Sequence, residues 1–118
     1  MPALPHLTAL AALAMMGLGM ACGQTTGEAA DSRPPVAHTV TMEASAFSPA
    51  DFTARPGDTV TFTNKDFFPH TATAADVFDS GALQPGASWT LTVGGDAESI
   101  SYLCLLHPTM TGTIRVER

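Results

Sequence analysis

The chain has 118 residues, of which 45% are hydrophobic and 14% are charged, and its formal net charge is -6 at pH 7. This length suits one domain with appended segments and leaves too little chain for two full domains. Nucleic acid is excluded as a partner, because phosphate recognition requires clustered basic side chains and the chain has only 5 Lys and Arg. Its 2 cysteines exclude a disulfide-rich scaffold.

The first 21 residues contain no Asp, Glu, Lys or Arg, and 15 of them are hydrophobic. The apolar run is short for a membrane-spanning helix, which needs about 20 apolar residues, and small residues follow it. Residues 1–21 are therefore interpreted as a signal peptide, and the protein is expected to be exported to the periplasm or the outer side of the cell membrane. A buried N-terminal helix is the alternative, because the segment lacks a basic n-region.

Cys22 follows this run directly, in a context that resembles a bacterial lipoprotein signal, where cleavage leaves a lipidated cysteine. Leu18 lies one position further from the cysteine than in that family, so ordinary cleavage after Ala21 or Ala30 is the alternative. Residues 22–35 are small, polar and rich in Pro, which predicts a flexible linker, lipid-anchored to the membrane if Cys22 is modified. Residues 36–118 are expected to form the folded domain.

Five segments of this domain alternate apolar and polar residues with a period of two: residues 36–42, 59–64, 88–93, 100–104 and 113–117. Turn formers separate them at residues 55–58, 84–86 and 94–96, and no amphipathic helix is predicted. Short strands joined by turns predict an all-β sandwich or barrel. Asn64 and Cys104 continue the inward faces of two strands, so each strand brings a polar or reactive group to an interior end of the domain.

The segment from Cys104 reads C-x-x-H-x-x-M, which adds His107 and Met110, and His70 lies upstream. A thiolate, two imidazoles and a thioether form the ligand set of a blue-copper electron-transfer site. Each residue alone has an ordinary structural interpretation, and the Cys–His pair alone would also suit zinc. Zinc, however, has little use for Met and usually takes more Cys or His.

Residues 36–118 resemble a cupredoxin of the plastocyanin/amicyanin group, and the short ligand loop is more similar to amicyanin. The similarity is carried by the ligand loop and by residues 46–49, 55–60, 63–66, 69–70 and 77–81. It implies a Greek-key β-sandwich of about eight strands and one type 1 copper ion bound by His70, Cys104, His107 and Met110. It also implies that the chain carries single electrons between redox proteins and is not itself an enzyme.

Two departures from that family bear on the site. Thr71 stands where the family often has Asn, although its backbone N–H can still donate to the Cys104 sulfur. Leu105 stands where a Ser or Thr commonly bonds the residue matching Asn64, so Asn64 is expected to bond the backbone instead. Such contacts tune the metal, so the reduction potential does not carry over.

A redox partner is expected to dock near His107, through a small apolar patch that contains Leu105, Leu106 and Pro108, with at least one of Phe67 and Phe68 packed inside the domain. The chain is expected to be a monomer, and its negative charge would steer a basic partner or only aid solubility.

Asp66, Asp76 and Asp79 are interpreted as solvated loop carboxylates, and no second metal site is expected at His38. The alternatives are a copper delivery or storage module with the same four ligands, and a redox subunit that serves one enzyme.

Overall fold

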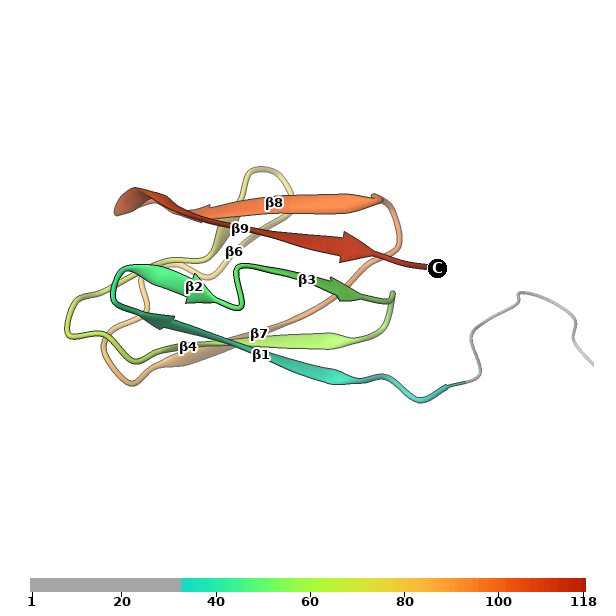
Figure 1. Cartoon of the computed structure of the whole chain (residues 1–118), viewed down its shortest axis with the longest axis horizontal. Helices are drawn as coiled ribbons and strands as arrows, with labels where there is room; N and C mark the ends of the chain where they lie inside the picture. Colours follow the sequence, from blue (N-terminus) through green and yellow to red (C-terminus); the bar gives the residue numbers. More distant parts are fainter. Residues whose placement is uncertain (1–32) are drawn as a thin grey trace, which may run out of the picture.

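The computed structural model describes residues 33–118 of the chain. The predicted signal peptide, most of the predicted linker and Cys22 lie outside these described residues. Within them the chain forms two facing β-sheets (Figure 1), and no helix that could cross a membrane occurs among them. The predicted all-β sandwich is therefore confirmed.

Nine strands make up the two sheets of the described residues. The first sheet has the order β2-β1-β4-β7, with β1 at Ala37–Glu43, β2 at Ala46–Ser48, β4 at Thr59–Asn64 and β7 at Ser88–Thr92. The second has the order β3-β9-β8-β5-β6, with β3 at Asp51–Ala54, β5 at Thr73–Ala74, β6 at Phe78–Asp79, β8 at Ser99–Cys104 and β9 at His107–Val116. The pairs β1/β4 and β3/β9 are parallel and the other pairs are antiparallel.

The five alternating segments correspond to β1, β4, β7, β8 and the second half of β9. Inward residues such as Val40, Met42, Val60 and Phe62 are fully buried, because a side-chain period of two sends every second residue to one face. Asn64 and Cys104 are also fully buried, as expected for the two inward positions that end β4 and β8.

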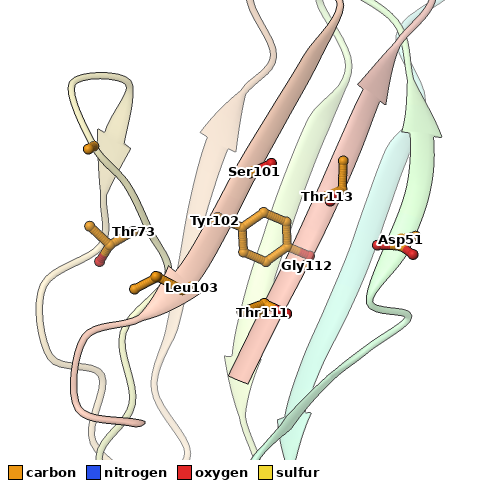
Figure 2. A pocket seen from close by; sticks show the side chains of 9 residues that line it. Asp51, Thr73, Ser101, Tyr102, Leu103, Thr111, Gly112 and Thr113 are labelled. Atoms are coloured by element: carbon orange, nitrogen blue, oxygen red, sulfur yellow. The ribbon is translucent and has the colours of Figure 1, made fainter. Parts of the chain in front are cut away.

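Tyr102 ties the two sheets together at the centre of the core. Its ring lies 5.4 Å from the ring of Phe62 and 4.8 Å from that of Phe47, and its hydroxyl donates to the carbonyl oxygen of Ala50 at 3.3 Å. Gly112 is the residue paired with Tyr102 across β8 and β9 (Figure 2), and a Cβ at that position would collide with the phenol and with the Ala50 oxygen. A glycine is therefore required here because another chain segment approaches so closely.

A shallow groove lies on the second sheet, where β5 pairs with β8 at one residue pair, Thr73 and Leu103. Its volume is about 480 Å³, and side chains from β3, β5, β8 and β9 line it (Figure 2). None of the four predicted metal ligands is among the lining residues, so this groove is separate from the predicted site.

A buried carboxylate fastens the start of β1 to the turn before β4. Asp58 accepts hydrogen bonds from the backbone N–H groups of Val36 and Arg55 at 2.9 and 3.0 Å, and from His38 Nε2 at 2.9 Å. Burial alone would raise the pKa of Asp58, but the Val36 amide, the His38 ring and the Arg55 amide stabilise the carboxylate and lower its pKa to about 2. This contact closes the end of the sandwich at which β4 begins.

We expect the Asp58→Asn variant to lose about 1–3 kcal/mol of unfolding free energy at neutral pH, because one amide oxygen cannot replace a carboxylate that accepts three bonds. A lowered pKa means that the carboxylate stabilises the wild type above about pH 4 and that this stabilisation is lost as the pH falls toward about 2. The variant should therefore show a flatter dependence of unfolding free energy on pH in that window, measured by urea denaturation. The exposed Asp76, changed to Asn, is the control; equal acid profiles for wild type and Asp58→Asn would contradict the assignment.

Candidate metal centre

Cys104 and His107 face each other because they flank a two-residue hairpin turn. Cys104 ends β8, His107 begins β9, and the two residues pair across the turn formed by Leu105 and Leu106. The preceding residue, Leu103, pairs with Thr111, so β9 carries three additional residues, 108–110, at this point. The C-x-x-H spacing is therefore the spacing of a tight hairpin that places thiol and imidazole side by side.

His70 reaches the same place from the loop between β4 and β5. Asn64, the last residue of β4, shapes this loop: its Nδ2 donates to the carbonyl oxygens of Phe68 at 2.7 Å and Leu83 at 2.9 Å. His70 also exchanges both backbone hydrogen bonds with Leu83, which fixes its main chain. The prediction that Asn64 bonds the backbone is confirmed.

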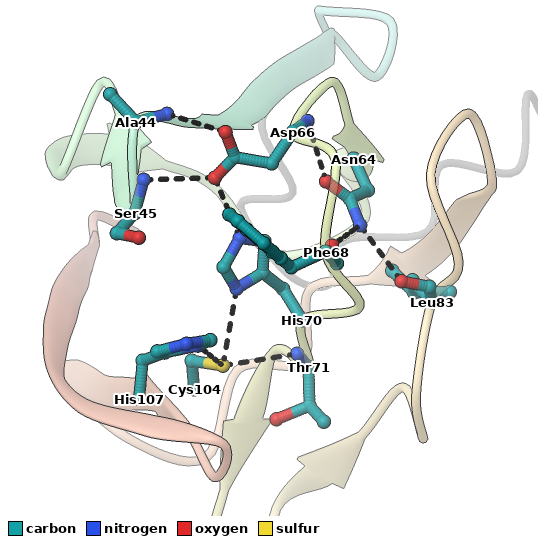
Figure 3. Close-up of polar contacts among 10 residues, drawn as sticks. All are labelled: Ala44, Ser45, Asn64, Asp66, Phe68, His70, Thr71, Leu83, Cys104 and His107. Carbon is teal, nitrogen blue, oxygen red and sulfur yellow. Dashed lines mark hydrogen bonds and ion pairs between the residues drawn. The ribbon is translucent and has the colours of Figure 1, made fainter.

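The three side chains form one compact donor cluster (Figure 3). Cys104 Sγ lies 3.7 Å from His70 Nδ1 and 4.0 Å from His107 Nδ1, and all three atoms lie within 4.8 Å of one another. Metal bonds of about 2.0–2.3 Å in a trigonal plane would place such donors about 3.5–3.8 Å apart. The cluster therefore fits a single ion with small side-chain adjustments, and its one thiolate and two imidazoles suit copper.

Thr71 connects the two ligand loops with both of its polar groups. Its backbone N–H donates to Cys104 Sγ at 3.3 Å, and its Oγ1 accepts the N–H of Leu105 at 2.9 Å. The first contact was predicted from the sequence and is confirmed. The second was not predicted; it ties the loop of His70 to the hairpin of Cys104.

The electrostatics of the cluster favour an ionised sulfur. Burial raises the pKa of the Cys104 thiol, but the Thr71 N–H and the rings of His70 and His107 outweigh burial and lower the pKa to about 7. Burial lowers the pKa of His70, but Asp66 and Cys104 more than offset this effect, so its pKa lies above the usual value. The groups around Cys104 therefore favour its thiolate form more than the surroundings of an ordinary buried thiol do.

Asp66 was interpreted as a solvated loop carboxylate, and this was wrong. Its side chain is only 11% exposed; one oxygen lies 2.7 Å from His70 Nε2, and the carboxylate accepts the backbone N–H groups of Ala44 and Ser45 at 2.9 Å each. The Ser45 amide and the His70 ring lower the pKa of Asp66. An Asp four residues before a ligand histidine is the sequence signal that could have indicated this contact.

Comparisons with known proteins found similar sequences and similar structures. No protein-family model matches the chain. The methylamine utilization protein MauL of Methylophilus methylotrophus is 30% identical over 90 residues, which cover 72% of this chain and 52% of MauL. The chain thus spans about half the length of that relative.

Among solved structures, a purple cupredoxin from Nitrosopumilus maritimus superposes with a TM-score of 0.62 at 25% identity, covering 68% of this chain and 99% of that one. The chain is a cupredoxin. A reduced Cu(I) amicyanin variant gives a TM-score of 0.63 at 26% identity, covering 76% of this chain and 87% of that one. A copper-containing nitrite reductase from Thermus scotoductus gives 0.65 at 29% identity, covering 80% of this cupredoxin but 25% of the enzyme.

The fourth predicted ligand, Met110, lies on β9 within the three additional residues and is 2% exposed in the core of the cupredoxin. It therefore points inward, three residues after His107. The expectation that Phe67 or Phe68 packs inside was wrong: their exposed fractions are 89% and 57%. The loop main chain, held by Asn64, leaves both rings on the outside.

In the metal-free protein we expect the Cys104 thiol to ionise with a pKa of about 7, below the usual value of about 8.5. The ultraviolet absorbance of the thiolate, followed during a pH titration, measures this directly. The full chain with Cys22→Ser isolates the Cys104 signal, and adding Cys104→Ser should remove the transition. Because the folded state has the lower pKa, the unfolding free energy should rise between about pH 7 and pH 9. A midpoint at or above 8.5 would show that the N–H and imidazole groups do not stabilise the thiolate.

Proposed function

We propose that this cupredoxin carries single electrons between redox proteins on one type 1 copper ion. The observation that carries the proposal is the cluster of one sulfur and two Nδ1 atoms within 4.8 Å of one another at the end of a cupredoxin sandwich. His70, Cys104 and His107 would hold the ion, with Met110 as a fourth and weaker ligand. The copper named for the amicyanin and nitrite reductase relatives supports the choice of metal.

Copper, when bound, supplies a one-electron couple between Cu(I) and Cu(II). The protein's part is to keep the ligands in one arrangement for both states. His70 and Cys104 are fully buried, and Thr71 and Asn64 tie their loops to neighbouring backbone, so the donors have little freedom to rearrange. A site that needs little rearrangement exchanges electrons faster, which is the property a carrier requires.

The proposed docking surface is the apolar end, defined as Phe67, Phe68, Leu105 and Leu106. Their exposed fractions lie between 49% and 89%, and they belong to the two loops that also carry His70 and His107. His107 is only half-buried, so an electron can enter or leave near its ring. Exposed apolar groups of this kind mark contact sites, and weak redox encounters use small interfaces.

We also propose that the chain acts outside the cytoplasm as a monomeric carrier, not as an enzyme. The support is the apolar segment of residues 1–21, the linker of residues 22–35 that precedes the domain of residues 36–118, and the lipoprotein-like context of Cys22. A lipid on Cys22 would tether the carrier to a membrane while the linker leaves the domain free to reach its partners. Mass spectrometry of the mature N-terminus measures both cleavage and lipidation.

The Cys104→Ser variant should lose the intense blue absorption of the copper protein, because that band is a charge transfer from the thiolate to Cu(II). The experiment is reconstitution with Cu(II), followed by visible spectroscopy and electron paramagnetic resonance. Wild type should be blue with narrow copper hyperfine splitting. A colourless wild type with a square-planar Cu(II) spectrum would favour a delivery or storage module, and survival of the band in Cys104→Ser would refute the ligand assignment.

Met110→Leu tests the fourth ligand in the same experiment. It should keep the blue band but raise the reduction potential, since loss of a weak donor favours Cu(I). An unchanged potential would exclude Met110 as a ligand.

The Leu106→Glu variant should slow electron self-exchange between reduced and oxidised protein by about 10-fold or more at low salt, because two apolar ends that each carry a new charge repel each other. Nuclear magnetic resonance line broadening measures the rate without knowledge of the partner. Part of the loss should return at high salt, and the visible spectrum should stay unchanged. Val36→Glu places the same charge on an exposed apolar residue at the other end of the sandwich. An equal effect of both variants would contradict docking at the apolar end.

A further inference from the structure

The carboxylate of Asp66 accepts its hydrogen bonds from protein groups, unlike a loop carboxylate that only water solvates. It joins three groups from two separate parts of the chain: the N–H groups of Ala44 and Ser45, both at 2.9 Å, and the Nε2 of His70 at 2.7 Å. Figure 3 shows the carboxylate between the turn and the ring, on the side of His70 away from Cys104. The electron-transfer proposal above makes no use of this arrangement.

The turn on which Asp66 rests is conformationally unfavourable by itself. Ala44 and Ser45 connect β1 to β2, and both have a φ of 55°, the left-handed region that normally requires Gly or Asn. With consecutive N–H groups facing the same way, such a turn forms a concave site for an anion. The carboxylate of Asp66 occupies it, so the turn and the carboxylate stabilise each other.

The contact with His70 has a consequence for the metal-facing side of the ring. An ionised carboxylate only accepts hydrogen bonds, so a neutral His70 that donates to Asp66 carries its proton on Nε2. Nδ1 then presents a free lone pair, and it is the atom 3.7 Å from Cys104 Sγ. We propose, on the basis of the proposed copper site, that Asp66 is a positioning residue that selects this tautomer and joins the β1–β2 turn to the metal centre.

Asp66 is the hydrogen-bond partner that the structure gives to the outer nitrogen of His70. The imidazole is fully buried, so no solvent can take the place of the carboxylate. Asp66 is itself fixed, because its N–H donates to Asn64 Oδ1 at 2.8 Å and both turn amides hold its oxygens. A hydrogen bond to the outer nitrogen of a ligand histidine sets both ring orientation and ligand basicity.

The chain contains a matched control for this residue. Asp58 also accepts two backbone N–H groups and the Nε2 of a histidine, His38, but at the end of the sandwich where β4 begins. Its substitution removes the same kind of interaction without touching the donor cluster. The two variants therefore separate a general loss of stability from an effect on the metal site.

The test compares Asp66→Asn with Asp58→Asn in the full-length chain. One amide oxygen cannot accept from both turn amides and from His70, so Asp66→Asn should expose the Ala44 and Ser45 amides to faster hydrogen exchange in the metal-free protein. The ¹⁵N shifts of the His70 ring, recorded at alkaline pH where the ring is neutral, should show loss of the single Nε2–H tautomer. Affinity for Cu(II), measured by competition with a chelator, should fall by about 10- to 100-fold, whereas Asp58→Asn should leave tautomer and affinity unchanged.

Unchanged His70 shifts in Asp66→Asn, or an equal loss of affinity in Asp58→Asn, would overturn the proposal. Ala44→Gly and Ser45→Gly added to Asp66→Asn should restore the stability of the turn but not the copper affinity; recovery of the affinity would mean that Asp66 acts through the turn alone. The tautomer measurement needs no metal. It therefore decides the role of Asp66 even if the wild type proves to bind no copper and the electron-carrier proposal fails.

Discussion

The burial of the Cys104 sulfur is the constraint on which the rest of the site depends. A fully buried thiol that ionises needs donors or positive charge around it, since removal of an anion from water is costly. The Thr71 N–H at 3.3 Å and the two imidazole rings provide this environment. The sulfur comes from β8 and one ring comes from the loop after β4, so two loops from opposite sheets must be held at a defined distance.

Hydrogen bonds at the bases of the two loops meet this requirement. Asn64 fixes the His70 loop through the carbonyl oxygens of Phe68 and Leu83, and the Thr71 hydroxyl holds the N–H of Leu105 in the hairpin of Cys104. Among the described residues no buried polar side-chain atom lacks a hydrogen-bond partner. A fully satisfied network of this kind is rigid, because any movement would leave a buried group unpaired. The donor cluster is therefore preorganised before a metal binds.

Sequence reasoning succeeded where a residue's role follows from a regular period or from ligand chemistry. The alternation in β1, β4, β7 and β8 predicted the inward faces, and the C-x-x-H motif with His70 predicted three residues that the structure brings together. The role of Met110 as a fourth ligand stays a prediction. The short strands β2, β3, β5 and β6 were missed, because two to four residues cannot display a period. The contacts of Asp66 and the outward rings of Phe67 and Phe68 were also missed. They depend on where an irregular loop lies against a distant turn, which no local pattern encodes.

The ligand end of the domain reverses the usual distribution of polar and apolar groups. Asn64, Asp66, His70 and Thr71 lie inside or nearly so, whereas large apolar side chains such as Phe67 and Leu105 face solvent. The buried polar groups and the exposed apolar side chains have one cause. Polar groups that form hydrogen bonds with one another do not need water, so the surface above them does not have to be polar. An apolar surface next to the half-buried His107 would exclude water from the contact with the proposed redox partner. The same hydrogen bonds that fix the donors therefore also allow an apolar surface close to the donor cluster.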